Sequence, residues 1–323
     1  MLKADPKPKI MVFFTSFECN LRCAMCFAWS KQKQTHQLSL GQIQNLFADS
    51  LIRDNLEIVN ITGGEPTLRA DLTEIIQIIL RNCSNLRRID LSTNGVNTAE
   101  VIDQAERILT LLLSTHVKLT ISISLDGVGQ LHERIRGSAG IFTKIEQTTE
   151  LLKELMLLYP FLSIGFNMTV SRLNYQAIEQ VHKYAANRGL GINFTLAAFS
   201  DIGVESSRVR AKFEINQEKK EKTAQILHDL LLAGKVDPQN TEFMLQWLKT
   251  GKRSGNCAFS RGRAFLLEPD GQVYICGNFK EFRLGNVAEQ TFQQVWRNAG
   301  KVLRTLNGKC INCNSNCYMN EAS

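Results

Sequence analysis

Short strand-like runs alternate with helical stretches between residues 10 and 200 of this 323-residue chain. A strand followed each time by a helix is the sequence form of a parallel sheet with covering helices. This alternation restricts the possible folds more than any other feature of the sequence, and it predicts an α/β architecture. The six runs cover residues 10–15, 57–62, 88–93, 118–125, 162–170 and 191–196.

The runs also alternate between apolar and polar residues, which strands of a parallel sheet buried on both faces would not do. In the fourth run Leu119, Ile121 and Ile123 share one face, and Ser122 and Ser124 share the other. If helices cover the apolar face, the polar face must line a cavity. We therefore expect an open six-strand (βα)6 partial barrel with a wet lumen. A closed eight-strand barrel would fill that space with branched side chains, and a sheet with one face in solvent suits antiparallel strands better.

Three helix starts support the same division of the chain. Each combines an N-cap residue with Glu or Gln three positions later, the spacing of a capping box. The pairs are Ser39 with Gln42, Asp71 with Glu74, and Asn97 with Glu100.

The pattern changes after the sixth run. A helix is predicted at residues 216–232, and the strand-like segments 265–267 and 272–275 flank Glu-Pro-Asp-Gly, a strong hairpin turn signal. Residues 291–306 are predicted to form one helix with a capping box. The expected units are a partial barrel in residues 1–200, a helical linker in 201–256 and a small C-terminal α+β domain in 257–323.

The composition is that of an ordinary globular protein, 44% hydrophobic with a formal net charge of +7. The first hydrophobic run, residues 10–14, is too short for a signal or membrane-spanning segment, so we expect a cytoplasmic protein without a membrane partner. The dense charged run at residues 218–222 has mixed sign and is expected on a solvated helix face. Because no basic, aromatic-interleaved patch accompanies the net charge, nucleic acid is not an expected partner.

Nine cysteines are distributed unevenly, and this favours metal binding over disulfides in a chain that keeps its thiols reduced. Three of them, Cys19, Cys23 and Cys26, lie in a short loop directly after the first run. Cys83 stands alone and is expected to be a buried apolar residue. Five more lie near the C-terminus: Cys257, Cys276, Cys310, Cys313 and Cys317.

The N-terminal thiols fit two kinds of metal site. Three thiolates can hold three irons of a four-iron cluster and leave the fourth iron open for an external ligand. Zinc requires four ligands, and His36 could complete a Cys₃His set. The spacing alone favours the cluster but leaves zinc open.

Gly63, Gly64, Glu65 and Pro66 end the second run. Two glycines let a ligand approach the backbone, and the carboxylate that follows could receive an ammonium group. The segment lacks the glycine spacing and the lysine of a phosphate-binding loop. Because it follows a cysteine-rich loop by one strand and helix, we interpret it as a ligand site and not as a plain turn.

Taken together, these motifs resemble the radical S-adenosylmethionine (SAM) enzymes. The resemblance covers about residues 10 to 200 and continues through 92–95 (Ser-Thr-Asn-Gly), 122–127 (Ser-Ile-Ser-Leu-Asp-Gly) and 132–137 (His-Glu-Arg-Ile-Arg-Gly). It implies that Cys19, Cys23 and Cys26 hold a [4Fe–4S] cluster whose open iron chelates the amino and carboxylate groups of SAM. One departure is Met25, since the residue before the third cysteine is usually aromatic.

The same resemblance implies where SAM binds. The stretch from Gly63 to Pro66 would hold the methionyl amino group. Polar side chains on the lumen face are candidate contacts to the ribose and the carboxylate, because buried polar groups need partners. Hydrogen bonds within the barrel are the alternative for all of them. These candidates are Asn94, Ser122, Ser124 and Arg136.

For the C-terminal cysteines, spacing alone allows a zinc ribbon. Beside a radical SAM unit, residues 257–317 resemble the SPASM extension or its shorter form, twitch, through the Asp270-Gly271-x₄-Cys276 hairpin and the helix with Trp296. This implies one auxiliary [4Fe–4S] cluster, since five cysteines are too few for two. The first-choice ligands are Cys257, Cys276, Cys310 and Cys313. Cys317 is either a substitute ligand or a free thiol that donates hydrogen.

The resemblance further implies that the enzyme cleaves SAM reductively, with electrons from a flavodoxin- or ferredoxin-type donor. The resulting 5′-deoxyadenosyl radical would abstract hydrogen from a substrate. The 18 residues before Cys19 are too few for an N-terminal peptide-recognition domain, which favours oxidation of a small polar metabolite. A peptide maturase that forms a crosslink and a radical epimerase with a thiol hydrogen donor are the alternatives. A non-catalytic zinc or iron–sulfur module is the competing class.

Overall fold

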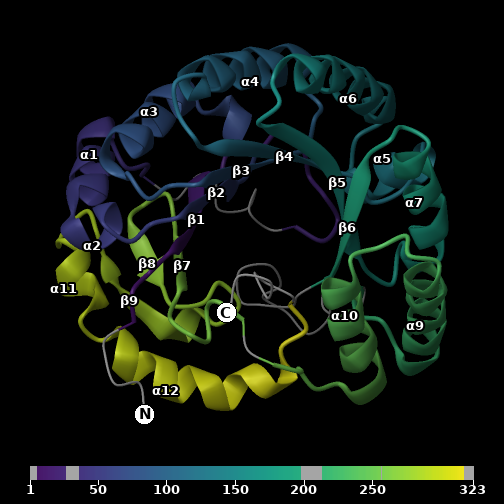
Figure 1. Cartoon of the computed structure of the whole chain (residues 1–323). Helices are drawn as coiled ribbons and strands as arrows, with labels where there is room; N and C mark the ends of the chain where they lie inside the picture. Colours follow the sequence, from purple (N-terminus) through teal and green to yellow (C-terminus); the bar gives the residue numbers. More distant parts are fainter. Residues whose placement is uncertain (1–5, 27–35, 198–212, 256, 316–323) are drawn as a thin grey trace.

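The computed structural model describes residues 6–26, 36–197, 213–255 and 257–315. Within these ranges nine strands form one sheet in the order β6-β5-β4-β3-β2-β1-β7-β8-β9. The strands curve into an arc, and helices lie along its outer side (Figure 1). The predicted α/β class and open partial barrel are therefore confirmed.

The first six strands are the six predicted runs, with bounds that differ by no more than one residue. Each pairs in parallel with the next along the sheet, from β1 to β6. Alternation of apolar and polar residues made most of these strands predictable, and β1 was indicated by a short apolar run. They are β1 (Ile10–Ser16), β2 (Ile58–Gly63), β3 (Arg88–Thr93), β4 (Lys118–Ser124), β5 (Leu162–Val170) and β6 (Gly191–Leu196).

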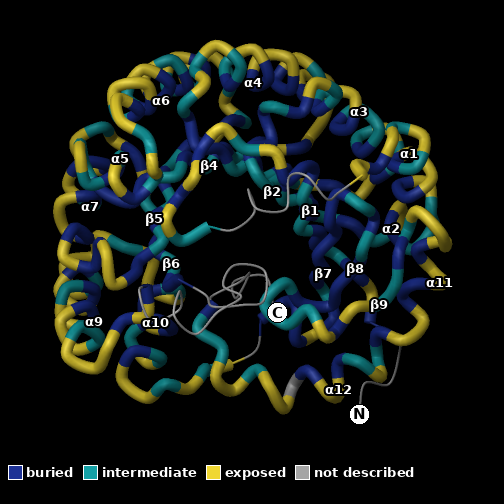
Figure 2. The backbone as a smooth tube through the Cα atoms, turned by 180° about the vertical axis from the view of Figure 1, so that it is seen from behind, coloured by how far each residue is buried: buried dark blue, intermediate teal, exposed yellow. Residues whose placement is uncertain are grey.

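The apolar face of the sheet packs against the helices. In β4, Leu119, Ile121 and Ile123 are fully buried, whereas Ser122 and Ser124 on the opposite face keep partial exposure. Burying one such aliphatic side chain stabilises the fold by about 1.5–3 kcal/mol. Figure 2 shows the exposed residues gathered on the outer turns of the helices. These helices are α1 (Leu40–Ala48), α2 (Ser50–Arg53), α3 (Leu72–Asn82), α4 (Thr98–Leu112), α5 (Gln130–Arg136), α6 (Ile141–Leu158) and α7 (Ile178–Ala186).

The C-terminal strands extend the same sheet. β7 (Ala264–Leu267) pairs in parallel with β1, and the predicted hairpin continues into β8 (Gln272–Tyr274) and β9 (Arg283–Asn286). Before them, α9 (Gln217–Leu232) and α10 (Pro238–Thr250) pack together and α10 reaches β6. The unit expected as an appended domain therefore shares backbone hydrogen bonds with the barrel.

The single helix predicted for residues 291–306 is wrong in one respect, because the chain forms two helices there. α11 (Phe292–Trp296) starts with the predicted capping box, and α12 (Ala299–Lys309) follows. Asn298 lies between them at φ −97° and ψ 0°, outside helical geometry. Asparagine has a low helix propensity, which suits a break between two helices.

Two smaller findings complete the fold. Cys83 is buried, as predicted for an isolated apolar cysteine. None of the helices in the described ranges is both long and apolar enough to span a membrane.

Candidate active site

The three N-terminal cysteines lie in the loop that follows β1. Cys23 is buried, and Cys19 and Cys26 are half-buried around a small apolar cluster that includes Leu21 and Met25. Burial raises the pKa of Cys19 to about 11, and negative charge on Glu65, Cys23 and Cys26 adds to the rise. The thiolates therefore need nearby positive charge, which cluster irons supply.

The glycines of the Gly-Gly-Glu-Pro motif permit close contact with the start of this loop. A Cβ on Gly63 would lie 2.2 Å from the Ser16 carbonyl oxygen, and one on Gly64 would lie 1.9 Å from that of Glu18. Gly64 N–H donates to the Ser16 carbonyl over 2.8 Å. The two glycines therefore let the end of β2 approach the chain's own backbone. The predicted approach of a ligand to them stays a prediction.

Glu65 is 1% exposed, and its carboxylate is used within the fold. It accepts hydrogen bonds from the Thr67 N–H (3.3 Å) and hydroxyl (2.8 Å), the Thr93 hydroxyl (2.9 Å) and the Asn94 N–H (2.7 Å). Burial raises its pKa, and these four hydrogen bonds oppose the rise. The carboxylate thus ties the end of β2 to the end of β3. The contact to the methionyl amino group that the sequence predicts stays a prediction. Pro66, buried at the start of the following 3₁₀ turn, completes the motif.

Asn94 directly follows β3 and is hydrogen-bonded to the cluster loop, the loop that carries Cys19, Cys23 and Cys26. Its side-chain N–H donates to Asn20 over 2.8 Å, and its carbonyl oxygen accepts from the Val96 N–H over 3.0 Å. Of the two roles weighed for Asn94, hydrogen bonding within the barrel is the one observed here. The cofactor contact stays a prediction.

A polar row crosses the inner face of the sheet. Ser124, Asn167 and Asn193 are in register on β4, β5 and β6. Asn193 donates to Asn167 over 3.0 Å and accepts from Asn240 of α10 over 3.2 Å. Ser122 lies two residues before Ser124 in β4 and therefore on the same face of the sheet. Asn193 and Asn240 were not predicted from the sequence. Alternation in β6 could have indicated Asn193, whereas the sequence carries no signal for Asn240.

Arg136, the last residue of α5, lies against the cluster loop. Its Nη1 donates to the Cys23 sulfur over 3.7 Å, and its Nη2 forms an ion pair with Asp126 at 2.8 Å. Burial alone would lower its pKa, but the charges of Asp126 and Cys23 leave it raised. Burial raises the pKa of Asp126, and Arg136 opposes that rise.

The C-terminal cysteines lie next to the extended sheet. Burial, then the charges of Cys257 and Cys313, raise the pKa of Cys310 to about 12, so these three thiols share one region. Cys276 is buried at the end of the hairpin, and Asn278 just after it donates to the Cys313 sulfur over 3.5 Å. Asn314 links this region to the end of β6 by donating to the Ala197 carbonyl over 2.7 Å. Cys317 lies outside the described residues.

In the described ranges no three Cys, His, Asp or Glu side chains converge closely enough to hold a single metal ion. His36, the possible fourth zinc ligand, is exposed. Each thiolate of a four-iron cluster binds a different iron, so such a site does not need that convergence. The N-terminal donor set, three thiols with a basic side chain beside one of them, fits a cluster.

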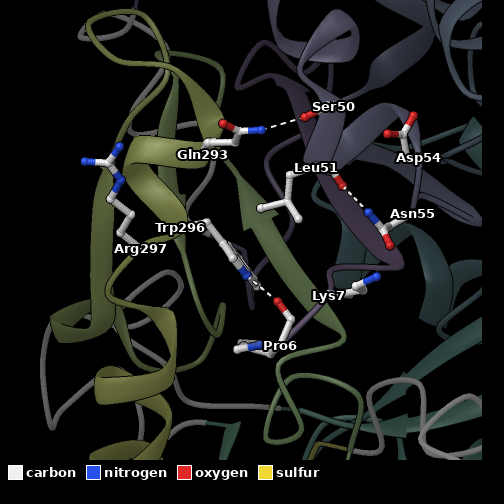
Figure 3. Close-up of a pocket in the computed structure, with 9 residues that line it drawn as sticks. All are labelled: Pro6, Lys7, Ser50, Leu51, Asp54, Asn55, Gln293, Trp296 and Arg297. Atoms are coloured by element: carbon white, nitrogen blue, oxygen red, sulfur yellow. Dashed lines mark hydrogen bonds between the residues drawn. The ribbon is translucent and has the colours of Figure 1, made fainter. Parts of the chain in front are cut away.

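A separate cavity of about 430 Å³ lies between the N-terminal residues, α2 and α11 (Figure 3). Gln293 donates to Ser50 over 2.5 Å, and the Trp296 indole donates to the Pro6 carbonyl over 2.6 Å. No cysteine lines this cavity, so it is not part of the predicted site. Its lining residues are Pro6, Lys7, Ser50, Leu51, Asp54, Asn55, Gln293, Trp296 and Arg297.

The family model described as the Radical SAM superfamily matches residues 14–191, more than half of the chain. The chain belongs to the radical SAM superfamily. A second model, SPASM, described as an iron–sulfur cluster-binding domain, matches residues 257–318. The two ranges contain the two cysteine groups, so the cofactors of this radical SAM protein are SAM and iron–sulfur clusters in both regions.

Curated relatives of this radical SAM protein align with nearly its whole length. The antilisterial bacteriocin subtilosin biosynthesis protein AlbA of Bacillus subtilis is 25% identical over 90% of this chain and 60% of its own length. The mycofactocin maturase MftC of Mycolicibacterium smegmatis is 28% identical over 95% of this chain and 75% of its own length. The chain thus spans less than two thirds of the subtilosin protein.

A solved structure supports the fold of the radical SAM chain. Native anSMEcpe with bound AdoMet superposes with a TM-score of 0.67 at 19% identity, covering 94% of this chain and 83% of that one. The fold is therefore shared over nearly the whole chain.

Proposed function

We propose that this protein oxidises a peptide by radical SAM chemistry. The observation that supports it is the pair of relatives named for bacteriocin biosynthesis and mycofactocin maturation, which align with 90% and 95% of the chain. A structure of anSMEcpe with a bound peptide has the same fold, with a TM-score of 0.65. The preference for a small polar metabolite rested on the short segment before Cys19, and this proposal replaces it.

When bound at Cys19, Cys23 and Cys26, the cluster and SAM supply a 5′-deoxyadenosyl radical that removes a hydrogen atom from the substrate. The chain fixes the position of this loop through Asn94 and Glu65. Ser122 and Ser124 stay candidate SAM contacts because they are partly exposed on the inner face of the sheet.

The polar row offers chemistry that suits a peptide. Asn side chains present a donor and an acceptor side by side, matching the N–H and C=O of a peptide group. Asn193 links the row to α10, so the row runs from the middle of the sheet to its edge. The main-chain groups of a peptide lying along this row could form hydrogen bonds with these side chains, beside Ser124.

Net oxidation also requires an electron acceptor. After loss of a hydrogen atom, the substrate would lose one electron to the cluster at Cys257, Cys276, Cys310 and Cys313 and one proton to solvent. A flavodoxin- or ferredoxin-type protein would serve as the external electron carrier. Together, the hydrogen atom, the electron and the proton amount to the loss of two hydrogens from the peptide. A new bond formed within the substrate peptide would account for this loss.

The test uses the enzyme reconstituted without oxygen and supplied with dithionite and SAM. Size-fractionated extract of the source cells is added, and 5′-deoxyadenosine is measured by liquid chromatography. We expect the peptide fraction to stimulate 5′-deoxyadenosine formation and protease digestion of that fraction to abolish the stimulation. Stimulation by the low-mass fraction that survives protease would restore the metabolite interpretation.

A further inference from the structure

Arg136 lies within hydrogen-bonding distance of one specific cluster ligand. Its Nη1 is 3.7 Å from the Cys23 sulfur, a length normal for a donor to sulfur. Cys23 is the most buried of the three N-terminal cysteines, and the Arg136 side chain is only 11% exposed. Little water can therefore screen the guanidinium charge from this sulfur.

Asp126 fixes the guanidinium from its other side. Its Oδ2 is 2.8 Å from Arg136 Nη2, and its Oδ1 accepts from the Thr169 N–H over 2.9 Å. The Asp126 N–H donates to His132 Nδ1 over 3.1 Å, and its carbonyl accepts from Asn174 over 3.0 Å. Asp126 is fully buried, and these hydrogen bonds fix both its side chain and its main chain.

The main chain at the end of α5 holds the same loop. The Ala24 N–H donates to the Ile135 carbonyl over 2.8 Å. Gly137, at φ +74°, lies so close to Arg22 that a Cβ would be 2.5 Å from its carbonyl oxygen. One helix end thus sets both the position of the loop and the position of the charge beside Cys23.

We infer that Arg136, oriented by Asp126, is a positioning residue that donates to the Cys23 sulfur and raises the reduction potential of the cluster held by Cys19, Cys23 and Cys26. Hydrogen bonds and positive charge at a ligand sulfur stabilise the reduced cluster, which carries one more negative charge. The inference rests on membership of the radical SAM superfamily and is independent of the proposed substrate.

The experiment measures the midpoint potential of the reconstituted full-length protein by EPR-monitored titration without SAM. The N-terminal cluster is identified as the one whose EPR signal changes when SAM is added afterwards. We expect Arg136→Gln to move this potential to a more negative value. We expect a smaller shift in the same direction for Arg136→Lys, because one ammonium cannot reach Asp126 and Cys23 with the geometry of a guanidinium.

Arg69→Gln is the matched control. Arg69 is also buried, forms an ion pair with Asp71 at 2.7 Å and donates to the Thr15 carbonyl over 2.6 Å. Its variant should retain the wild-type potential, and an equal shift there would overturn the inference.

An unchanged potential in iron-loaded Arg136→Gln would also overturn it. So would weaker SAM binding in that variant with an unchanged potential, which would assign Arg136 to the cofactor carboxylate. If Arg136→Gln does not retain iron, Arg136→Lys decides, and a wild-type potential in Arg136→Lys would refute the inference.

Discussion

Two glycines at the end of β2 determine how closely the cluster loop can approach the sheet. Gly64 and Glu65 both donate main-chain hydrogen bonds to the segment that leads into Cys19, the second over 2.7 Å to the Glu18 carbonyl. A side chain at Gly64 would occupy the position of that carbonyl oxygen. The motif therefore forms hydrogen bonds with the protein's own backbone at the start of the cluster loop.

Gly64→Ala should separate the cluster loop from β2. Overpacking of this kind costs about 1–3 kcal/mol, and we expect the variant to lose iron from the N-terminal cluster while keeping the C-terminal one. Iron analysis after anaerobic reconstitution provides the measurement. Gly41→Ala is the control, because its Cβ would meet nothing closer than the Ser39 hydroxyl at 3.9 Å. Full iron content in Gly64→Ala would contradict the steric account.

His132 makes stability depend on pH. Burial, together with the charge of Arg136, lowers its pKa from 6.5 to about 3, so the folded state keeps the ring neutral. Its Nδ1 accepts from Asp126, and its Nε2 is buried without a hydrogen-bond partner in the described ranges. The unfolded chain binds a proton below pH 6.5 and the folded chain does not. Stability is thus complete above that pH and falls below it.

Urea unfolding of the metal-free chain should show this loss. Between pH 6.5 and about 5, His132 should account for about 2 kcal/mol, at about 1.4 kcal/mol per pH unit. His132→Gln should remove that part of the slope, and the exposed His228→Gln should not. A wild-type slope in His132→Gln would show that other groups cause the loss.

At the candidate site, the sequence indicated the residue types more easily than the contacts that each residue makes. The spacing of Cys19, Cys23 and Cys26 is local, so the sequence carried it. The roles of Glu65 and Asn94 depend on which strand ends meet, and alternation within each strand does not encode that. Asn240 joins the polar row only because α10 packs beside β6, a contact between segments far apart in sequence.

At the scale of elements, the strands and the three predicted helix starts are confirmed, but the predicted capping bonds are only partly so. Ser39 and Gln42 form the expected capping box, but neither Asp71 nor Asn97 makes a side-chain cap hydrogen bond. Asp71 instead pairs with Arg69 at 2.7 Å. The capping-box spacing does not predict the capping bond at Asp71, because a neighbouring arginine binds the carboxylate that would cap the helix.

β7 joins the predicted C-terminal unit to the sheet of the partial barrel. It pairs with β1 from Ile10 to Phe13 and covers an edge of the parallel sheet that would otherwise be open. Open strand edges pair with other chains and promote aggregation. The sequence could not predict this pairing, because four residues of β7 carry no register signal.

A chain that ends after residue 256 should therefore aggregate. We expect it in the insoluble fraction, or as large species in size-exclusion chromatography, because the edge of β1 is exposed. The full-length variant with Cys257, Cys276, Cys310 and Cys313 changed to Ala keeps β7 and should stay soluble. A monomeric truncated chain would mean that β1 does not need this neighbour.

At the scale of the whole molecule, one sheet carries both cysteine groups. The N-terminal group follows β1, and Cys276 follows β8, two strands away in the sheet order. The polar row lies on the other side of β1, across β4 to β6. The two cysteine groups and the polar row are thus carried by strands of one hydrogen-bonded sheet.

The fate of the substrate radical can be measured with the C-terminal thiols. If the auxiliary cluster accepts an electron, Cys276→Ala and Cys313→Ala should still produce 5′-deoxyadenosine at about the wild-type rate but form no product. Cys317→Ala should then behave like the wild type. Deuterium incorporation from heavy water at the reacting carbon that disappears in Cys317→Ala would instead identify an epimerase.

The pairing of β1 with β7 also affects how the protein folds during synthesis. β1 leaves the ribosome before β7, and the five strands β2 to β6 are made between them. Contacts so distant in sequence form slowly. Until they form, the exposed strand edge of the partly folded chain can bind other chains. The order of synthesis therefore leaves this edge of β1 without its partner until β7 emerges.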